Sequence, residues 1–71
     1  MVEYKAPYGG TVYDVGVKIG DVVKKGDNLC RVEAMKAITS IDSIAEGIVK
    51  EVRVKNEAPV DRDQVLIVVG D

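Results

Sequence analysis

The residue of this chain best suited to chemistry is Lys36, which stands in the stretch RVEAMKAIT, residues 31–39. Neither a second lysine nor a buried apolar run stands beside it to make its amine a strong nucleophile at neutral pH. The chain has no histidine, and no serine or cysteine is placed beside a base. We therefore predict that the chain catalyses nothing itself and that Lys36 is a handle for another enzyme.

The local structure of this stretch is the next question. Four good helix formers follow one another here: Glu33, Ala34, Met35 and Lys36. Isolated helices much shorter than about 12 residues are marginal, and the flanking residues alternate as strand residues do. We therefore predict a tight hairpin turn. Such turns normally place glycine or asparagine at positions of positive φ, so this unusual composition indicates a functional site.

The length of the chain, 71 residues, supports one small domain, residues 1–71. The single cysteine, Cys30, argues against a disulfide scaffold and favours a reducing compartment, and we expect it to be a small buried strand residue. The longest purely apolar run, residues 65–69, is far shorter than the roughly 20 residues that span a bilayer. We expect a soluble protein of the cytoplasm or an organelle matrix, without membrane insertion and monomeric as an isolated domain.

Charge and aromatic content exclude nucleic acid as a partner. The net charge is −2, basic and acidic residues are interleaved, and three tyrosines are the only aromatic residues. The carboxylates of Glu57, Asp61 and Asp63 lie close in sequence, but they have neither the order nor the glycine of a calcium loop. We predict that they are solvated and that the chain has no metal site.

The rest of the chain is built of short β-branched stretches that alternate with polar residues and are separated by turn signals. Shifting the chain by 37 places lays residues 10–33 on residues 47–70 without a gap. Identical residues then coincide at several apolar and glycine positions, among them Gly10 with Gly47, Val12 with Val49, Leu29 with Leu66 and Val32 with Val69. The sequence therefore predicts an internal repeat with half-repeats of about 10–33 and 47–70.

Two copies of a roughly four-strand unit predict an all-β fold of about eight strands. We expect two four-stranded antiparallel sheets that face each other as a flattened barrel or sandwich, related by an approximate two-fold axis. Residues 31–39 lie between the copies, so Lys36 is predicted to sit on the central hairpin turn.

The quoted motifs closely resemble those of the biotinyl domains, also called biotin carboxyl carrier domains, of biotin-dependent carboxylases and decarboxylases. The family's biotin-accepting lysine lies in a Glu-Ala-Met-Lys-Met motif, which residues 33–36 match as EAMK. APYGGTV, VKIGDVVKKGDNLCRVEAMK and EGIVKEV resemble the family's other conserved elements, so the likeness covers nearly the whole chain.

This resemblance implies that a biotin protein ligase uses ATP to join biotin to the ε-amine of Lys36. Glu33, Ala34, Met35 and Ala37 would form the motif that the ligase recognises. The implied partners are a biotin carboxylase, which loads carbon dioxide on biotin, and a carboxyltransferase, which exchanges it with an acceptor. The domain itself would be a non-catalytic carrier whose tether raises the effective concentration of biotin at both sites.

Two departures leave alternatives open. Ala37 stands where biotinyl domains usually have Met or Leu, and alanine there is typical of the lipoyl domains of 2-oxoacid dehydrogenase complexes, which share the fold. The lipoyl motif has a carboxylate at the place of Met35, so Met35 favours biotin. An unmodified interaction module is the third reading. The second departure, residues 43–45 in place of a second Ala-Pro, is expected to cost only a fixed φ.

Overall fold

The computed structural model describes all residues, 1–71, and contains eight strands and no helix. No part of it is therefore a helix that could cross a membrane. In chain order the strands are β1 (Val2–Lys5), β2 (Gly10–Tyr13), β3 (Val22–Val23), β4 (Asn28–Ala34), β5 (Ala37–Asp42), β6 (Gly47–Val52), β7 (Pro59–Val60) and β8 (Val65–Gly70).

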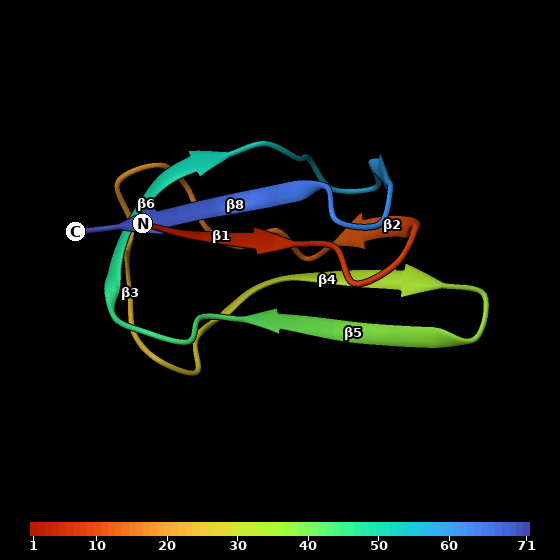
Figure 1. The fold of residues 1–71 in the computed structure, drawn as a ribbon, viewed down its shortest axis with the longest axis horizontal. Coiled ribbons are helices and arrows are strands. Elements are labelled where there is room, and N and C mark those ends of the chain that lie inside the picture. The colour runs from red at the N-terminus through yellow and green to blue at the C-terminus, as the bar shows by residue number, and fades with distance from the viewer.

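The strands form two four-stranded antiparallel sheets, as the sequence predicts. One sheet has the order β1-β8-β6-β3 and the other has the order β5-β4-β2-β7. The two sheets are not closed into one barrel, so the flattened sandwich is the form that the fold takes. Figure 1 shows both chain ends at one end of the sandwich and the β4–β5 hairpin at the other.

The internal repeat is present in the fold as an approximate two-fold axis. The axis exchanges β1 with β5, β2 with β6, β3 with β7 and β4 with β8. This exchange converts the strand order of the first sheet into that of the second. The register obeys the same shift, because Val12 pairs with Val32 in one sheet and Val49 pairs with Val69 in the other. The bounds of the half-repeats, about 10–33 and 47–70, stay a prediction.

Each sheet takes strands from both halves of the chain. β1 pairs with β8 and β3 pairs with β6, so the first and last strands lie side by side (Figure 1). A single half would therefore leave every strand without part of its pairing, and we conclude that the two halves fold together.

The core lies between the sheets and is built from the apolar residues that the repeat superposes. Four of these superposed pairs are buried in both copies: Val12 with Val49, Val23 with Val60, Leu29 with Leu66, and Val32 with Val69. Cys30, which corresponds to Ile67, is also fully buried. The period-two pattern of the strands thus places one row of side chains from each sheet in the shared interior.

Residues 43–45 have a role that the sequence did not reveal. The backbone amide of Ile44 donates a hydrogen bond to the Tyr4 hydroxyl at 3.0 Å, and that hydroxyl lies 3.3 Å from Oγ of the buried Ser43. A proline at position 44 would have no amide hydrogen to donate. The expectation that only a fixed φ is lost here is therefore wrong, because this loop gains a hydrogen bond to β1.

Five loop positions have positive φ, and four of them are related by the repeat. Gly20 and Gly26 have φ of 96° and 92°, and their counterparts, Glu57 and Asp63, have φ of 71° and 66°. A side chain fits at these places, since Cβ atoms on Gly20 and Gly26 would meet nothing within 4 Å. If a side chain at Gly20 or Gly26 destabilises the fold, the reason is therefore the left-handed backbone conformation and not a steric clash.

Replacing Gly20 or Gly26 with alanine is expected to lower the free energy of unfolding by about 1–2 kcal/mol each. The matched control is Gly16→Ala, because Gly16 has no positive φ and its Cβ would lie 3.9 Å from the nearest atom. This control should be neutral or stabilising by up to about 1 kcal/mol. Urea denaturation measures all three, and an equal loss in Gly16→Ala would contradict the backbone explanation.

Candidate functional site

The candidate site is the tip of the β4–β5 hairpin. Ala34 and Ala37 form the last registered pair, so the connecting loop consists of only two residues, Met35 and Lys36. The hairpin extends past the rest of the sandwich along its long axis (Figure 1). The predicted tight hairpin turn with Lys36 at its tip is confirmed.

The backbone of this turn explains its composition. Neither Met35 nor Lys36 has positive φ, so the loop is not the type I′ turn that requires glycine or asparagine. Among two-residue turns with negative φ, type I places both central residues in or near the helical region. Since neither residue has positive φ, this turn does not need the glycine or asparagine that a type I′ turn requires.

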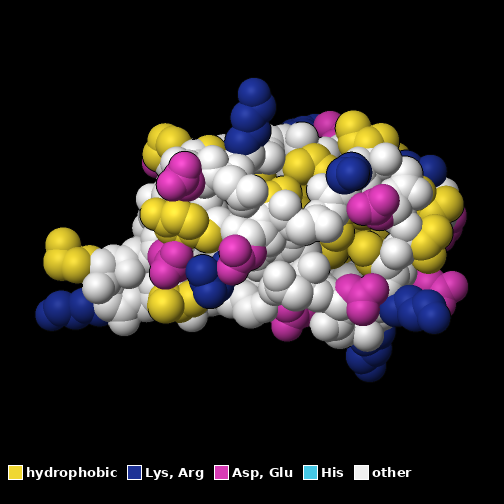
Figure 2. Space-filling view, turned by 180° about the vertical axis from the view of Figure 1, so that it is seen from behind, with side chains coloured by type: hydrophobic (Ala, Val, Ile, Leu, Met, Phe, Trp, Pro, Cys, Tyr) yellow, Lys and Arg dark blue, Asp and Glu magenta, His cyan; other side chains and the backbone are white.

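The side chains at the tip are open to solvent. Met35 is 97% exposed and Ile38, the second residue of β5, is 64% exposed, while Ala34, Lys36 and Ala37 are also exposed. Lys36 makes no ion pair and no side-chain hydrogen bond. Figure 2 shows this narrow end, where hydrophobic and basic side chains project farthest. The amine is thus accessible, and apolar surface lies beside it.

Glu33 lies apart from the exposed tip. It is paired with Thr11 on β2, and its carboxylate is 3.7 Å from the Arg31 guanidinium, which also contacts Asp14 at 3.0 Å. Ion pairs this exposed stabilise a fold by about 0–1 kcal/mol. The structure therefore brings Ala34, Met35, Lys36 and Ala37 together at the tip and keeps Glu33 on the body of the sheet.

An open depression of about 400 Å³ lies beside the hairpin and was not foreseen from the sequence. Its lining includes Thr11 and Tyr13 of β2, Glu33 and Met35. A second depression, of about 330 Å³, is lined by Gly47 and Ile48 at the two-fold related position near the chain ends. The repeat itself thus creates the depression, and what distinguishes the hairpin end is the two-residue turn that carries Met35 and Lys36.

The base of the hairpin is held by polar side chains. Asn28 Nδ2 donates to Ser40 Oγ at 2.7 Å and to Asp42 Oδ1 at 3.1 Å, and Ser40 Oγ donates to the same carboxylate at 2.7 Å. The hydrogen bonds from Ser40 and then Asn28 hold the pKa of Asp42 below its usual value. These bonds join β4 to β5 and so fix the register of the two strands.

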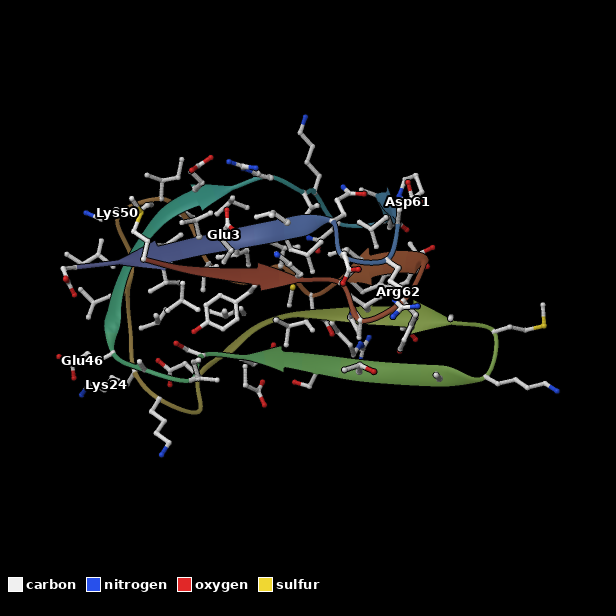
Figure 3. The ribbon with its side chains drawn as sticks, viewed as in Figure 1. Glu3, Lys24, Glu46, Lys50, Asp61 and Arg62 are labelled. Atoms are coloured by element: carbon white, nitrogen blue, oxygen red, sulfur yellow. The ribbon has the colours of Figure 1, made fainter.

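The other candidate residues take no part in this site. Burial raises the pKa of the Cys30 thiol to about 11, so Cys30 is a protonated core residue, as predicted. The structure contains no group of three or more His, Cys, Asp or Glu placed to hold a metal ion. Asp61 lies with Arg62 on the loop between β7 and β8, on the body of the molecule and away from the tip (Figure 3).

Comparison with known proteins places the chain among its relatives. The family model Biotin_lipoyl, described as "Biotin-requiring enzyme", matches residues 2–69. The chain belongs to this biotin/lipoyl family.

Curated relatives of this biotin/lipoyl chain include carrier proteins and larger enzymes. It is 38% identical to the biotin carboxyl carrier protein of acetyl-CoA carboxylase of Pseudomonas aeruginosa, over 92% of this chain and 46% of that protein. It is 37% identical to the mitochondrial pyruvate carboxylase of Mus musculus, over 87% of this chain and 5% of that protein. The chain spans about half or less of the length of these relatives.

Solved structures show the same fold in a lipoyl domain and in part of a carboxylase. The lipoyl domain of the 2-oxoglutarate dehydrogenase complex of Azotobacter vinelandii matches the whole chain with a TM-score of 0.86 at 22% identity, over 98% of that domain. The urea carboxylase of Kluyveromyces lactis matches 97% of the chain with a TM-score of 0.83 at 25% identity, over 6% of that enzyme. As the sequence predicts, the fold alone does not separate a biotin carrier from a lipoyl carrier.

Proposed function

We propose that this chain is a biotin carboxyl carrier domain whose Lys36 receives biotin from a separate biotin protein ligase. The observation that carries the proposal is the placement of Lys36 on a two-residue tip, without contacts of its own and beside the 97% exposed Met35. The carboxylase names of the curated relatives support biotin as the attached group.

The tip suits the chemistry of attachment. The amine nitrogen of Lys36 would attack the carboxyl carbon of biotin that ATP has activated, an amide bond would form, and the displaced phosphate group and the proton would leave. A ligase must enclose the amine for this step, and a projecting two-residue turn exposes it from nearly every side. Met35 and Ile38 offer apolar area that the ligase can bury beside the amine.

The function of the modified domain is positional. A biotin carboxylase would load the carboxyl group on biotin and a carboxyltransferase would pass it to, or take it from, an acceptor. The tether keeps biotin at high effective concentration near both sites, and the sandwich supplies a rigid base from which the arm extends. The domain needs no catalytic residue and no metal for this task.

The proposal is tested by intact mass. The full chain is incubated with biotin, ATP and a biotin protein ligase, and in parallel with lipoate, ATP and a lipoate ligase. We expect a gain of one biotinyl group and no gain with lipoate, because Met35 replaces the carboxylate of the lipoyl motif. A gain with lipoate alone would make the chain a lipoyl carrier, and no gain with either would favour an unmodified interaction module.

The substitution Ala37→Met tests the departure from the biotinyl motif. The added side chain is expected to raise kcat/KM for biotin attachment by about five- to thirtyfold, since burying it in the ligase is worth about 1–2 kcal/mol. The fold should not change, because Ala37 is exposed. Ala45→Met is the control, as Ala45 is exposed in the loop that precedes β6, and an equal gain there would contradict a contact at position 37.

A further inference from the structure

The approximate two-fold axis offers an internal comparison between the two ends of the molecule. At the hairpin end Val32 is paired with Thr39, and at the other end the corresponding pair is Val69 with Val2. Tyr8 lies in the loop before β2, and its counterpart in the second copy is Ala45. The structure therefore differs between its two ends at the places where Tyr8 and Thr39 meet.

Tyr8 joins the two strands of the hairpin to the body of the fold. Its hydroxyl donates to the backbone oxygen of Val32 at 3.1 Å and lies 2.8 Å from Thr39 Oγ1. Its half-buried ring packs against the core. Neither Ala45 nor Val2 has a hydroxyl, so the end without the lysine has no equivalent contact.

The strand that follows Lys36 has little else to hold it near the tip. β5 is the edge strand of its sheet, and its only neighbouring strand is β4. No backbone hydrogen bond outside the regular strand ladder involves residues 37–42. The bonds from Asn28 to Ser40 and Asp42 tie β5 only to β4, which belongs to the same hairpin. Tyr8 therefore makes the only side-chain hydrogen bond that reaches β5 from outside the hairpin.

The two strands of the hairpin are also supported unequally. β2 pairs with β4 as far as Glu33, one residue before the end of that strand. β5 has its contact with Tyr8 at Thr39, three residues after Lys36. The direction of the tip thus depends on β2 holding one strand and on the Tyr8 hydroxyl holding the other.

We propose that Tyr8 is a positioning residue for Lys36, which acts through Thr39 to hold β5 and so presents the tip in one orientation to its modifying enzyme. This inference rests on the proposed function. Loss of one such hydrogen bond is expected to make local opening of the hairpin about fivefold more frequent. A ligase that recognises the closed hairpin would then act on the variant with a correspondingly lower kcat/KM.

The experiment compares Tyr8→Phe and Thr39→Val with two controls in the full chain. Thr39→Ser keeps the hydroxyl and should behave as the wild type. Tyr4→Phe removes another tyrosine hydroxyl, the one that bonds Ile44 near the base of the hairpin. Two quantities are measured well below the unfolding midpoint: amide hydrogen exchange of residues 37–40, and kcat/KM for attachment of biotin by biotin protein ligase.

Tyr8→Phe and Thr39→Val should each raise exchange at residues 37–40 about fivefold and lower kcat/KM about two- to fivefold, because kcat/KM follows the fraction of hairpins that stay closed. Tyr4→Phe should lower the unfolding midpoint while changing neither quantity. Unchanged exchange in Tyr8→Phe, or unchanged kcat/KM despite faster exchange, would overturn the proposal, as would equal effects in Tyr4→Phe.

The experiment distinguishes a failure of the proposed carrier function from a failure of the role proposed for Tyr8. If the wild type takes up no biotin, the carrier function fails while the exchange measurement still decides the role of Tyr8. Faster exchange at residues 37–40 in Tyr8→Phe but not in Tyr4→Phe would then support Tyr8 as the residue that positions the tip. Equal exchange in both variants would remove that role as well.

Discussion

Replacement of Lys36 with arginine is expected to abolish the gain of one biotinyl group completely. Arginine keeps the positive charge, but its guanidinium stays protonated in proteins and does not accept an acyl group at neutral pH. The fold should be unchanged, because Lys36 is exposed and makes no ion pair or side-chain hydrogen bond. Intact mass after incubation with biotin protein ligase, biotin and ATP measures the loss, and the unfolding midpoint measures the fold.

Lys24→Arg and Lys50→Arg are the matched controls for this change. Both lysines project from the body near the chain ends, far from the hairpin (Figure 3). We expect each control to gain one biotinyl group at the rate of the wild type. A mass gain that persists in Lys36→Arg would show that the ligase modifies a different amine, and Lys36 would lose its proposed role.

Gly10→Ala is expected to lower the free energy of unfolding by about 3 kcal/mol, the largest effect on stability that we predict for one methyl group. A Cβ at Gly10 would overlap the backbone oxygen of Glu33, so β2 and β4 would have to separate. A domain of this size has a total stability of roughly 4–10 kcal/mol, so the unfolding midpoint should fall by about 10–20 °C.

The glycines nearby provide the controls for this effect. Gly9→Ala should change stability little, because its Cβ would lie 3.6 Å from the nearest atom, which is ordinary contact. Gly47→Ala should destabilise much as Gly10→Ala does, since its Cβ would lie 2.7 Å from the backbone oxygen of Gly70. Thermal unfolding measures the stability of the three variants. A loss of stability in Gly9→Ala equal to that in Gly10→Ala would contradict the steric explanation.

The two tight glycines also separate stability from function. The position of a Cβ at Gly10 lies against the backbone of Glu33, close to the hairpin tip, whereas that of a Cβ at Gly47 lies against the backbone of Gly70, at the end that carries the chain termini. Among molecules that remain folded, displacement of β4 by Gly10→Ala should therefore impair biotin attachment more than Gly47→Ala does.

Much of the fold could be predicted because its signals are local or repeated. Val12 and Val49, or Leu29 and Leu66, occupy equal places in two alternating patterns, and burial on one face of a strand requires that alternation. The position of Lys36 on a turn between the two copies followed from the same repeat. The all-β sandwich and the hairpin could therefore be predicted from the sequence alone.

The conformational reason for the composition of the turn could not be predicted from the sequence. Glycine and asparagine are expected in the commonest two-residue hairpins, so from the sequence their absence at Met35 and Lys36 indicates a functional site. The negative φ of both residues supplies a conformational reason as well. Sequence reports which residues are present, but the backbone region that each one occupies depends on how the flanking strands twist.

By itself the sequence determined that this is an all-β repeat with an available lysine between its halves, because periodicity and the motif EAMK are properties of neighbouring residues. Only the tertiary structure decided that β1 pairs with β8, that Gly10 touches Glu33, and that the Tyr8 hydroxyl reaches Thr39. The residues in these contacts are 23 to 67 positions apart in the sequence. No local pattern specifies such partners, since they are selected by the packing of two sheets around one core.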